Sequence, residues 1–327
     1  MKPKAKRIKA PVSYLDLEAR PMKPLVLFHG GCQDGWCAAW AAWRRFGDAA
    51  EYRAVQYGDD PPADDLDGRD VYILDFSYPL DAMERIAKAS AQLVLLDHHK
   101  TAYDALLKNT PRGFGMVCKA NDTITIVQDR SGAQLAWDHF HEGQPRPWII
   151  DYVADRDLWQ WKLPDSREVN AYLGSLPHDF AVWNRLVEFA NAAIDPMFNK
   201  PPDLFVAYGQ VILQARAREI ERAVKRARRM MLTTGQANDI PAYALGVIDS
   251  SIAPLVVNAT ENMSEVLNQL AREPPGWAIG WFQDETGRYS YSLRSSEQGP
   301  DVSAIAKAFG GGGHAKAAGF EADRLLF

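Results

Sequence analysis

The chain has few cysteines, and it lacks the features that mark secreted and membrane proteins. Its three cysteines, Cys32, Cys37 and Cys118, are too few and too unevenly spaced for a disulfide framework or a zinc knuckle, which favours a reducing compartment. No apolar run reaches membrane-spanning length, and the N-terminus has no apolar core of the kind a signal peptide needs. We therefore expect a cytoplasmic protein with no membrane partner.

An excess of basic residues is also missing. The chain carries 37 Lys and Arg residues against 42 Asp and Glu residues, for a formal net charge of −5. Proteins that coat duplex DNA usually carry a clear basic excess, so this balance argues against that function. The charge balance is compatible with short or local contacts between the protein and nucleic acid. The basic opening stretch, 1–22, is predicted to be a flexible, solvated tail.

The length predicts two folded domains. At 327 residues, with 47% apolar and 24% charged residues, the chain can fill two ordinary globular cores. After the tail we expect a first domain at 23–200, a connecting helix at 201–235 and a smaller domain at 236–327.

The first domain shows strands that alternate with helices. The strands are short and continuously apolar, which is typical of a mostly parallel sheet with helices on both faces, and so of an α/β fold. In such sheets the chemistry gathers at the carboxyl ends of the strands. We predict strands at 24–28, 51–57, 71–76 and 93–97, and helices at 34–46, 79–89 and 101–109.

The second domain is predicted to be a mixed α/β unit. A long helical run with a basic face, 215–231, leads into it, and that face is interpreted as solvated charge. Strands are predicted at 242–249, 276–283 and 288–296, and helices near 263–272 and 301–309.

Three predicted strands of the first domain end on ionisable residues. His29 follows the first strand, Asp75 ends a second, and the triplet Asp97 to His99 ends a third. Imidazole with carboxylate suits divalent metals, and the hard oxygens favour Mn²⁺ or Mg²⁺, with Asp75 able to bridge two ions. Burying the triplet without a metal would cost on the order of several kcal/mol. His29 by itself is better interpreted as a hydrogen-bonded packing residue.

The two adjacent histidines should differ in role. Successive residues of a strand point to opposite faces, so His98 and His99 cannot easily serve one ion in the same way. One would ligate metal, and the other would face the substrate as a donor to a phosphate oxygen or to the leaving group.

A run of four glycines, 310–313, precedes His314. Four glycines in a regular element lose much backbone entropy on folding, so something must compensate. Glycine amides can approach an anion closely, and we interpret the run as a phosphate cradle. A flexible linker is the alternative, although the apolar segment that follows indicates a strand.

Together these motifs resemble the DHH phosphoesterases that carry a DHHA1 domain. The resemblance rests on DHHK at 97–100, an H-x4-DG motif at 29–35, DFS at 75–77 and GGGGH at 310–314. It extends from about residue 24 to 320 and is closest to the small oligoribonuclease and nucleotide phosphatase branch. It implies a DHH metal-binding catalytic domain followed by a DHHA1 substrate-binding domain.

The resemblance also implies roles for individual residues. His29, Asp34 and His98 would be metal ligands and Asp75 the bridging carboxylate. His99 would contact the scissile phosphate, and Asp97 would orient its neighbours. Substrate would be held by residues of the second domain, namely Arg294, Gly311, Gly312, Gly313 and His314.

Two positions stay open. The family's fourth motif is an aspartate after a helix, and the segment YVADRDLW supplies two candidates. We prefer Asp155 for its spacing to an aromatic residue, and Asp157 is the competing candidate. Many relatives carry D-x-D in the first motif, whereas Cys32 stands at the earlier aspartate here. Either Cys32 is itself a metal ligand, or the metal site that lacks this aspartate binds its ion weakly, or the enzyme works with a single metal ion. A role of Cys32 as a small packing residue beside the helix start is an equal alternative.

The predicted function is a metal-dependent phosphoesterase. We expect Mn²⁺, or alternatively Mg²⁺, as two ions, and a short single-stranded oligonucleotide or a nucleotide as substrate. Hydrolysis of polyphosphate or pyrophosphate is the alternative reaction, and a non-catalytic nucleotide sensor is the alternative class. Base-stacking aromatics would favour nucleotides. The tryptophans at 36, 40, 43, 159 and 161 could stack on bases, although most are better interpreted as core or domain-interface packing. A homodimer stays open.

Overall fold

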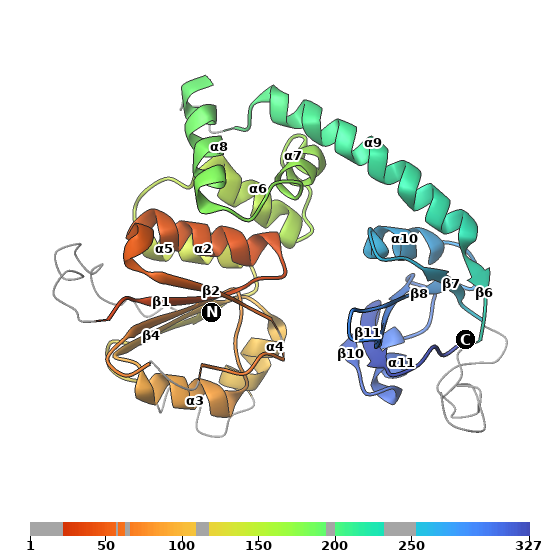
Figure 1. The fold of residues 1–327 in the computed structure, drawn as a ribbon, viewed down its shortest axis with the longest axis horizontal. Helices are drawn as coiled ribbons and strands as arrows, with labels where there is room; N and C mark the ends of the chain where they lie inside the picture. The colour runs from red at the N-terminus through yellow and green to blue at the C-terminus, as the bar shows by residue number, and fades with distance from the viewer. Residues whose placement is uncertain (1–21, 57, 63–65, 109–117, 194–199, 232–252) are drawn as a thin grey trace, which may run out of the picture. The chain divides into compact units, whose positions relative to one another are not determined.

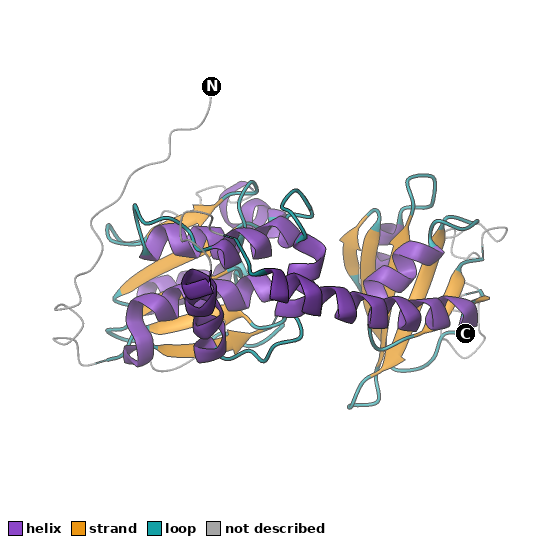
Figure 2. Cartoon of the chain, turned by 90° about the horizontal axis from the view of Figure 1, so that it is seen from above, coloured by secondary structure: helices purple, strands orange, loops and turns teal. Residues whose placement is uncertain are grey.

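The computed structural model describes residues 22–327 except 57, 63–65, 109–117, 194–199 and 232–252. The chain forms two compact units, 1–212 and 213–327, and the division falls within one long helix, α9 (Asp203–Arg226). Figure 2 shows α9 as one uninterrupted helix. The helix is shorter than the predicted 201–235, because a two-residue strand, β6 (Arg228–Arg229), follows it. The predicted tail, 1–22, lies almost wholly outside the described residues, and the predicted strand at 242–249 lies entirely outside them.

The first unit is built on a five-stranded parallel sheet, so the α/β prediction is confirmed. The strand order is β2-β1-β3-β4-β5, with every neighbouring pair parallel. Its strands are β1 (Leu25–His29), β2 (Glu51–Val55), β3 (Asp70–Leu74), β4 (Gln92–Asp97) and β5 (Thr123–Ile126).

Helices cover both faces of this sheet (Figure 1). Within β1, Val26 and Phe28 face a core shared with α2 and α5, while Leu25 and Leu27 face a second core shared with α3. This alternation explains why the strand is apolar throughout. The helices of the unit are α2 (Gln33–Phe46), α3 (Leu80–Ala89), α4 (Lys100–Tyr103), α5 (Gly132–Phe140), α6 (Trp148–Asp157), α7 (Ser166–Leu173) and α8 (Phe180–Ala193), with a 3₁₀ turn, Gly47–Ala49, and a π turn, Asp104–Lys108.

The second unit contains a six-stranded mixed sheet, as predicted for a smaller mixed α/β domain. The strand order is β10-β11-β9-β8-β7-β6, in which only β7 and β8 run parallel. Its strands after β6 are β7 (Leu255–Asn258), β8 (Trp277–Gln283), β9 (Tyr289–Ser295), β10 (Gly312–His314) and β11 (Ala317–Ala322). Helix α11 (Val302–Ala308) packs on one face of the sheet, and α10 (Met263–Leu270) packs on the other together with the end of α9.

Across both units, the described helices include none that combines the length and the apolar character needed to cross a membrane.

Candidate metal and phosphate site

A cluster of imidazoles, carboxylates and one thiol lies at the carboxyl edge of the parallel sheet. Strands β1, β3 and β4 are neighbours in that sheet, so the residues at their ends meet. The start of α2 and the end of α6 supply the other members. The cluster contains His29, Cys32, Asp34, Asp75, His98, His99 and Asp157.

Asp75 is the centre of this cluster. It directly follows β3, its side chain is 1% exposed, and its backbone adopts φ 56°, a left-handed conformation that is uncommon outside glycine. Its backbone N–H donates to the carbonyl of Leu96, which ties it to β4. Strain of this kind is maintained only where the surroundings enforce it, and it gathers at functional sites.

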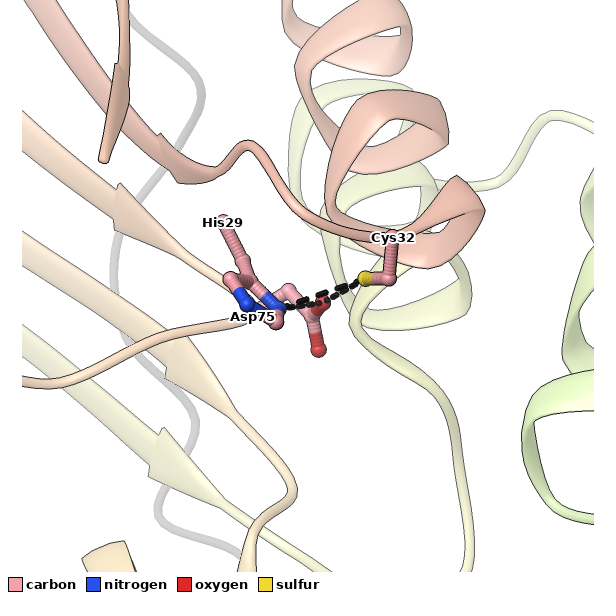
Figure 3. Close-up of side chains that lie close together, drawn as sticks. All are labelled: His29, Cys32 and Asp75. Carbon is pink, nitrogen blue, oxygen red and sulfur yellow. Dashed lines mark hydrogen bonds and ion pairs between the residues drawn. The ribbon is translucent and has the colours of Figure 1, made fainter. Parts of the chain in front are cut away.

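The two oxygens of Asp75 face two different sets of groups. Oδ2 lies 3.2 Å from the Cys32 sulfur and 3.7 Å from Nδ1 of His29, and these two groups are 3.3 Å apart (Figure 3). Oδ1 lies 3.1 Å from Nε2 of His98. A carboxylate placed between two sets of candidate ligands has the geometry that a bridging ligand requires.

The second set gathers around His98. Its Nε2 lies 3.8 Å from Oδ2 of Asp34 and 3.4 Å from Oδ2 of Asp157, in addition to the contact with Asp75. His98 and His99 do not diverge as the strand alternation predicted, because β4 ends at Asp97 and both histidines follow it. Their ring centroids are 4.5 Å apart, and both have a nitrogen within reach of Asp75.

Asp34 is held by the start of helix α5, which sequence reasoning missed. Its Oδ2 accepts a hydrogen bond of 2.6 Å from the Gly132 N–H, and its Oδ1 accepts one of 3.2 Å from Ala133. The first turn of a helix offers free N–H donors and a positive dipole end, which suit a carboxylate. The Ser-Gly pair at 131–132 was the available signal, since Ser131 accepts from the Gln134 N–H as the N-cap of α5.

Gly132 is required by its contact with Asp75. A Cβ at position 132 would lie 2.5 Å from Cβ of Asp75 and 2.7 Å from its Oδ1. Those distances are well inside van der Waals contact, so any larger residue would displace the central carboxylate. The start of α5 therefore packs directly against the cluster.

Asp97 supports the two histidines and lies behind the cluster. Its Oδ1 accepts hydrogen bonds from the backbone N–H groups of His98 (2.7 Å) and His99 (3.0 Å), and lies 2.8 Å from Nδ1 of His99. Asp97 is fully buried, whereas the side chain of His99 is 33% exposed. This geometry suits the orienting role that the resemblance implied for Asp97.

Asp157, and not the preferred Asp155, lies in the cluster. Both oxygens of Asp155 accept backbone hydrogen bonds from the turn after α6, from Lys162 at 2.9 Å and from Leu163 at 3.2 Å. Asp155 thus shapes the turn, while Asp157 extends from the end of α6 toward His98. The spacing to an aromatic residue could not decide between Asp155 and Asp157, because both lie in the last turn of α6.

Burial and mutual contact shift the pKa values in this cluster. Burial raises the pKa of Asp75, but contact with His29 and with positively charged His98 outweighs burial and holds the pKa below its usual range. Burial and the charges of Asp75 and Asp157 raise the pKa of Asp34. Burial lowers the pKa of His98, but the contact with Asp75 and the nearby carboxylates outweigh burial and raise it to about 9. Burial and the charge of Asp75 raise the pKa of the Cys32 thiol.

The residues present fit divalent cations. Three carboxylates surround the single imidazole of His98, which concentrates negative charge in a largely buried place. Oδ1 of Asp75 and Nε2 of His98 are buried 3.1 Å from each other, and within the described part of the chain neither atom has a hydrogen bond of ordinary geometry. Buried polar atoms are rarely left in this state, and a shared cation would satisfy both.

The predicted substrate residues lie in the second unit. Arg294 is on β9, half-buried, and its Nη2 donates to the Ser264 hydroxyl at 2.9 Å. The glycine run is not a simple loop, because Gly312–His314 form β10, an exposed edge strand paired with β11. Two of its glycines are also required by the local structure. A Cβ at Gly311 would lie 2.1 Å from the carbonyl oxygen of Gly319, and Gly313 adopts φ 138°, a conformation that favours glycine.

Known proteins resemble both parts of the chain. The DHHA1 domain family matches residues 253–325, within the second unit. An uncharacterized protein of Acanthamoeba polyphaga mimivirus is 27% identical over 318 residues, which cover 90% of this chain and 66% of that protein. The oligoribonuclease NrnB of Bacillus subtilis is 26% identical over 258 residues, which cover 76% of this chain and 58% of that enzyme. The chain thus spans less than two thirds of the length of either relative.

One solved structure aligns with most of this chain. An exopolyphosphatase-related protein from Bacteroides fragilis has a TM-score of 0.48 at 12% identity, covering 95% of this chain and 89% of its own. The second unit matches the DHHA1 domain, and this match, the Asp97-His98-His99 motif in the first unit and the two sequence relatives together support the DHH/DHHA1 phosphoesterase family for this chain.

Proposed function

We propose that the protein is a metal-dependent phosphoesterase that hydrolyses phosphodiester or phosphomonoester bonds of short oligonucleotides or nucleotides. The main support for this proposal is that the two oxygens of Asp75 face two separate sets of candidate ligands. His29 and Cys32 would hold one cation with Asp75, and Asp34, His98 and Asp157 would hold the other, with Mn²⁺ or Mg²⁺ suited to the oxygen-rich set. Bound cations supply Lewis acidity for a phosphoryl oxygen and activate water.

His99 is proposed as the residue that contacts the scissile phosphate. Its ring is partly exposed, while Asp97 fixes the ring orientation through Nδ1. Burial lowers the pKa of His99, but contact with Asp97 and the charge of Asp75 outweigh burial and raise it. A protonated imidazole beside the reacting phosphate can donate to an oxygen that gains negative charge.

Trp159 favours nucleotides over inorganic polyphosphate. It stands two residues after Asp157, its side chain is 63% exposed, and its backbone adopts φ 53°. Trp161 lies beside it at a ring-centroid distance of 5.1 Å, and the Arg167 guanidinium lies 4.3 Å over the Trp161 ring. Exposed aromatic rings beside cations bind nucleobases by stacking, whereas polyphosphate has no ring to stack.

Product release from a 5′-labelled pentanucleotide tests the proposal. With Mn²⁺ we expect shortened products from the wild-type chain, loss of turnover with a chelator, and at least about a hundredfold lower rate in His99→Ala. His178→Ala is the matched control, since His178 is an exposed histidine outside the cluster. Release of phosphate from polyphosphate but not from the oligonucleotide would favour the alternative reaction. Binding without turnover under saturating Mn²⁺ would identify a nucleotide sensor and refute the enzyme.

A further inference from the structure

We propose that His29, Cys32 and Asp75 form a site for a thiophilic divalent cation of the zinc class, and that the two cation positions at this edge prefer different metals. This inference rests on the proposed function in one respect, because both positions share Asp75. It departs from the expectation that Mn²⁺ or Mg²⁺ fills both positions.

The separations between the three ligand atoms lie within about 0.1 Å of the range expected around a tetrahedral ion. They are 3.3 Å from sulfur to Nδ1 of His29, 3.2 Å from sulfur to Oδ2 of Asp75, and 3.7 Å from Nδ1 to Oδ2. Zinc bonds of about 2.3 Å to sulfur and about 2.0–2.1 Å to nitrogen or oxygen place tetrahedral ligands about 3.3–3.6 Å apart. An octahedral magnesium at about 2.0–2.1 Å would place neighbouring oxygen or nitrogen ligands only about 2.9 Å apart, which is shorter than the 3.7 Å between Nδ1 of His29 and Oδ2 of Asp75.

The donor atoms of the two positions differ in chemical softness. The first position offers a thiol sulfur and an imidazole with one carboxylate oxygen, a set that selects zinc-like ions. Around His98 the second position offers carboxylates of Asp34 and Asp157 besides that of Asp75, which suits a harder ion. One edge of the sheet therefore presents a soft and a hard position that meet at one carboxylate.

The local fold holds the Cys32 sulfur at this position. Cys32 is the N-cap of α2, and its sulfur accepts a hydrogen bond of 3.3 Å from the Gly35 N–H. Gly35 permits close packing here, since a Cβ there would lie 2.2 Å from the His29 carbonyl oxygen.

Helix capping by itself does not account for a cysteine at this position. Sulfur is a weak acceptor, and Ser, Thr, Asp or Asn caps a helix better. The sulfur also lies 3.2 Å from Oδ2 of the buried Asp75 and 3.3 Å from Nδ1 of His29, which are two further metal-binding atoms. The sulfur thus belongs to a group of metal-binding atoms as well as to the helix start.

Cobalt spectroscopy of the full chain, stripped of metal with a chelator, tests this site. We expect Co²⁺ to produce a sulfur-to-cobalt charge-transfer band in the near ultraviolet, which disappears in Cys32→Ser. Cys118→Ser is the matched control and should keep the band, because Cys118 is half-buried and outside the cluster. Equimolar Zn²⁺ should displace the cobalt and remove the band, whereas Mg²⁺ in large excess should leave it.

A second variant keeps the inference falsifiable if serine disturbs the helix start. Cys32→Asp retains a capping side chain, and it should lose the band and shift preference from Zn²⁺ toward Mn²⁺. Cobalt bound by the wild type without a sulfur band, or a band that persists in Cys32→Ser, would overturn the inference. The readout needs no turnover, so a chain that shows the band but cleaves no oligonucleotide would refute only the proposed function.

Discussion

Replacing Gly132 with alanine sets two physical effects of opposite sign against each other at the centre of the site. Gly132 is the first residue of α5, and helix propensity by itself favours alanine over glycine by up to about 1 kcal/mol. The added Cβ, however, would lie 2.5 Å from Cβ of Asp75 and 2.7 Å from its Oδ1. Forcing a methyl group into packed surroundings costs about 1–3 kcal/mol. We therefore expect net destabilisation, by up to about 2 kcal/mol.

The same substitution should weaken metal binding. Asp75 already occupies a strained backbone conformation at φ 56°, so it can move away from Gly132 only by shifting its carboxylate relative to His98 and Cys32. We expect Mn²⁺ affinity to fall at least about tenfold in Gly132→Ala, since ligand positions must hold within tenths of an ångström. Urea unfolding measures the stability change, and calorimetric titration measures the affinity.

Gly174→Ala provides the matched control. Gly174 is the C-cap of α7 with φ −72°, and a Cβ there would lie 3.2 Å from the flexible end of Gln33 and 3.3 Å from the carbonyl oxygen of Asn170, much farther than the 2.5 Å contact at Gly132. We expect a small change in stability and unchanged Mn²⁺ affinity. If Gly132→Ala is as stable as the wild type and binds Mn²⁺ equally well, the close packing of α5 against Asp75 does not position the ligand, and the reasoning is refuted.

Three further predictions follow from individual residues. Asp157→Asn should lower Mn²⁺ affinity while leaving stability nearly unchanged. Asp155→Asn should lower stability by about 1–3 kcal/mol, because the buried Asp155 carboxylate accepts two backbone hydrogen bonds. Equal loss of metal affinity in both variants would contradict this division. Burial lowers the pKa of His139 to about 4. As the pH falls, the unfolded chain therefore binds a proton at this histidine before the folded chain does. The protein should lose up to about 3 kcal/mol of stability between about pH 6.5 and 4. Urea unfolding across that range should show a shallower pH slope for His139→Leu, and parallel slopes would refute the assignment. Trp159→Ala should weaken binding of a dinucleotide at least about fivefold more than binding of its abasic analogue, as measured by fluorescence titration, and an equal loss for both ligands would exclude stacking.

Much of the fold is visible in local patterns. The strands β1, β3 and β4 were predicted within about two residues, because continuous apolar runs between turn residues mark buried parallel strands. Strands β5 and β7 were missed, since four residues such as TITI or LVVN carry too little pattern to stand out. The predicted helix near 101–109 corresponds to α4 followed by a π turn, a distinction that periodicity does not make.

The sequence by itself determined the protein's class and the membership of most of its site. Residues at the ends of parallel strands must share one edge of a sheet, so His29, Asp75 and His98 could be placed together without coordinates. Only the tertiary structure distinguished Asp157 from Asp155, brought the start of α5 against Asp75, and placed the Cys32 sulfur at ligand distance from two partners. These features depend on how a helix end turns and how closely two backbones approach. The contacts of Asp75 with Cys32 and with the start of α5 join residues far apart in the chain, so no local pattern of residues encodes them.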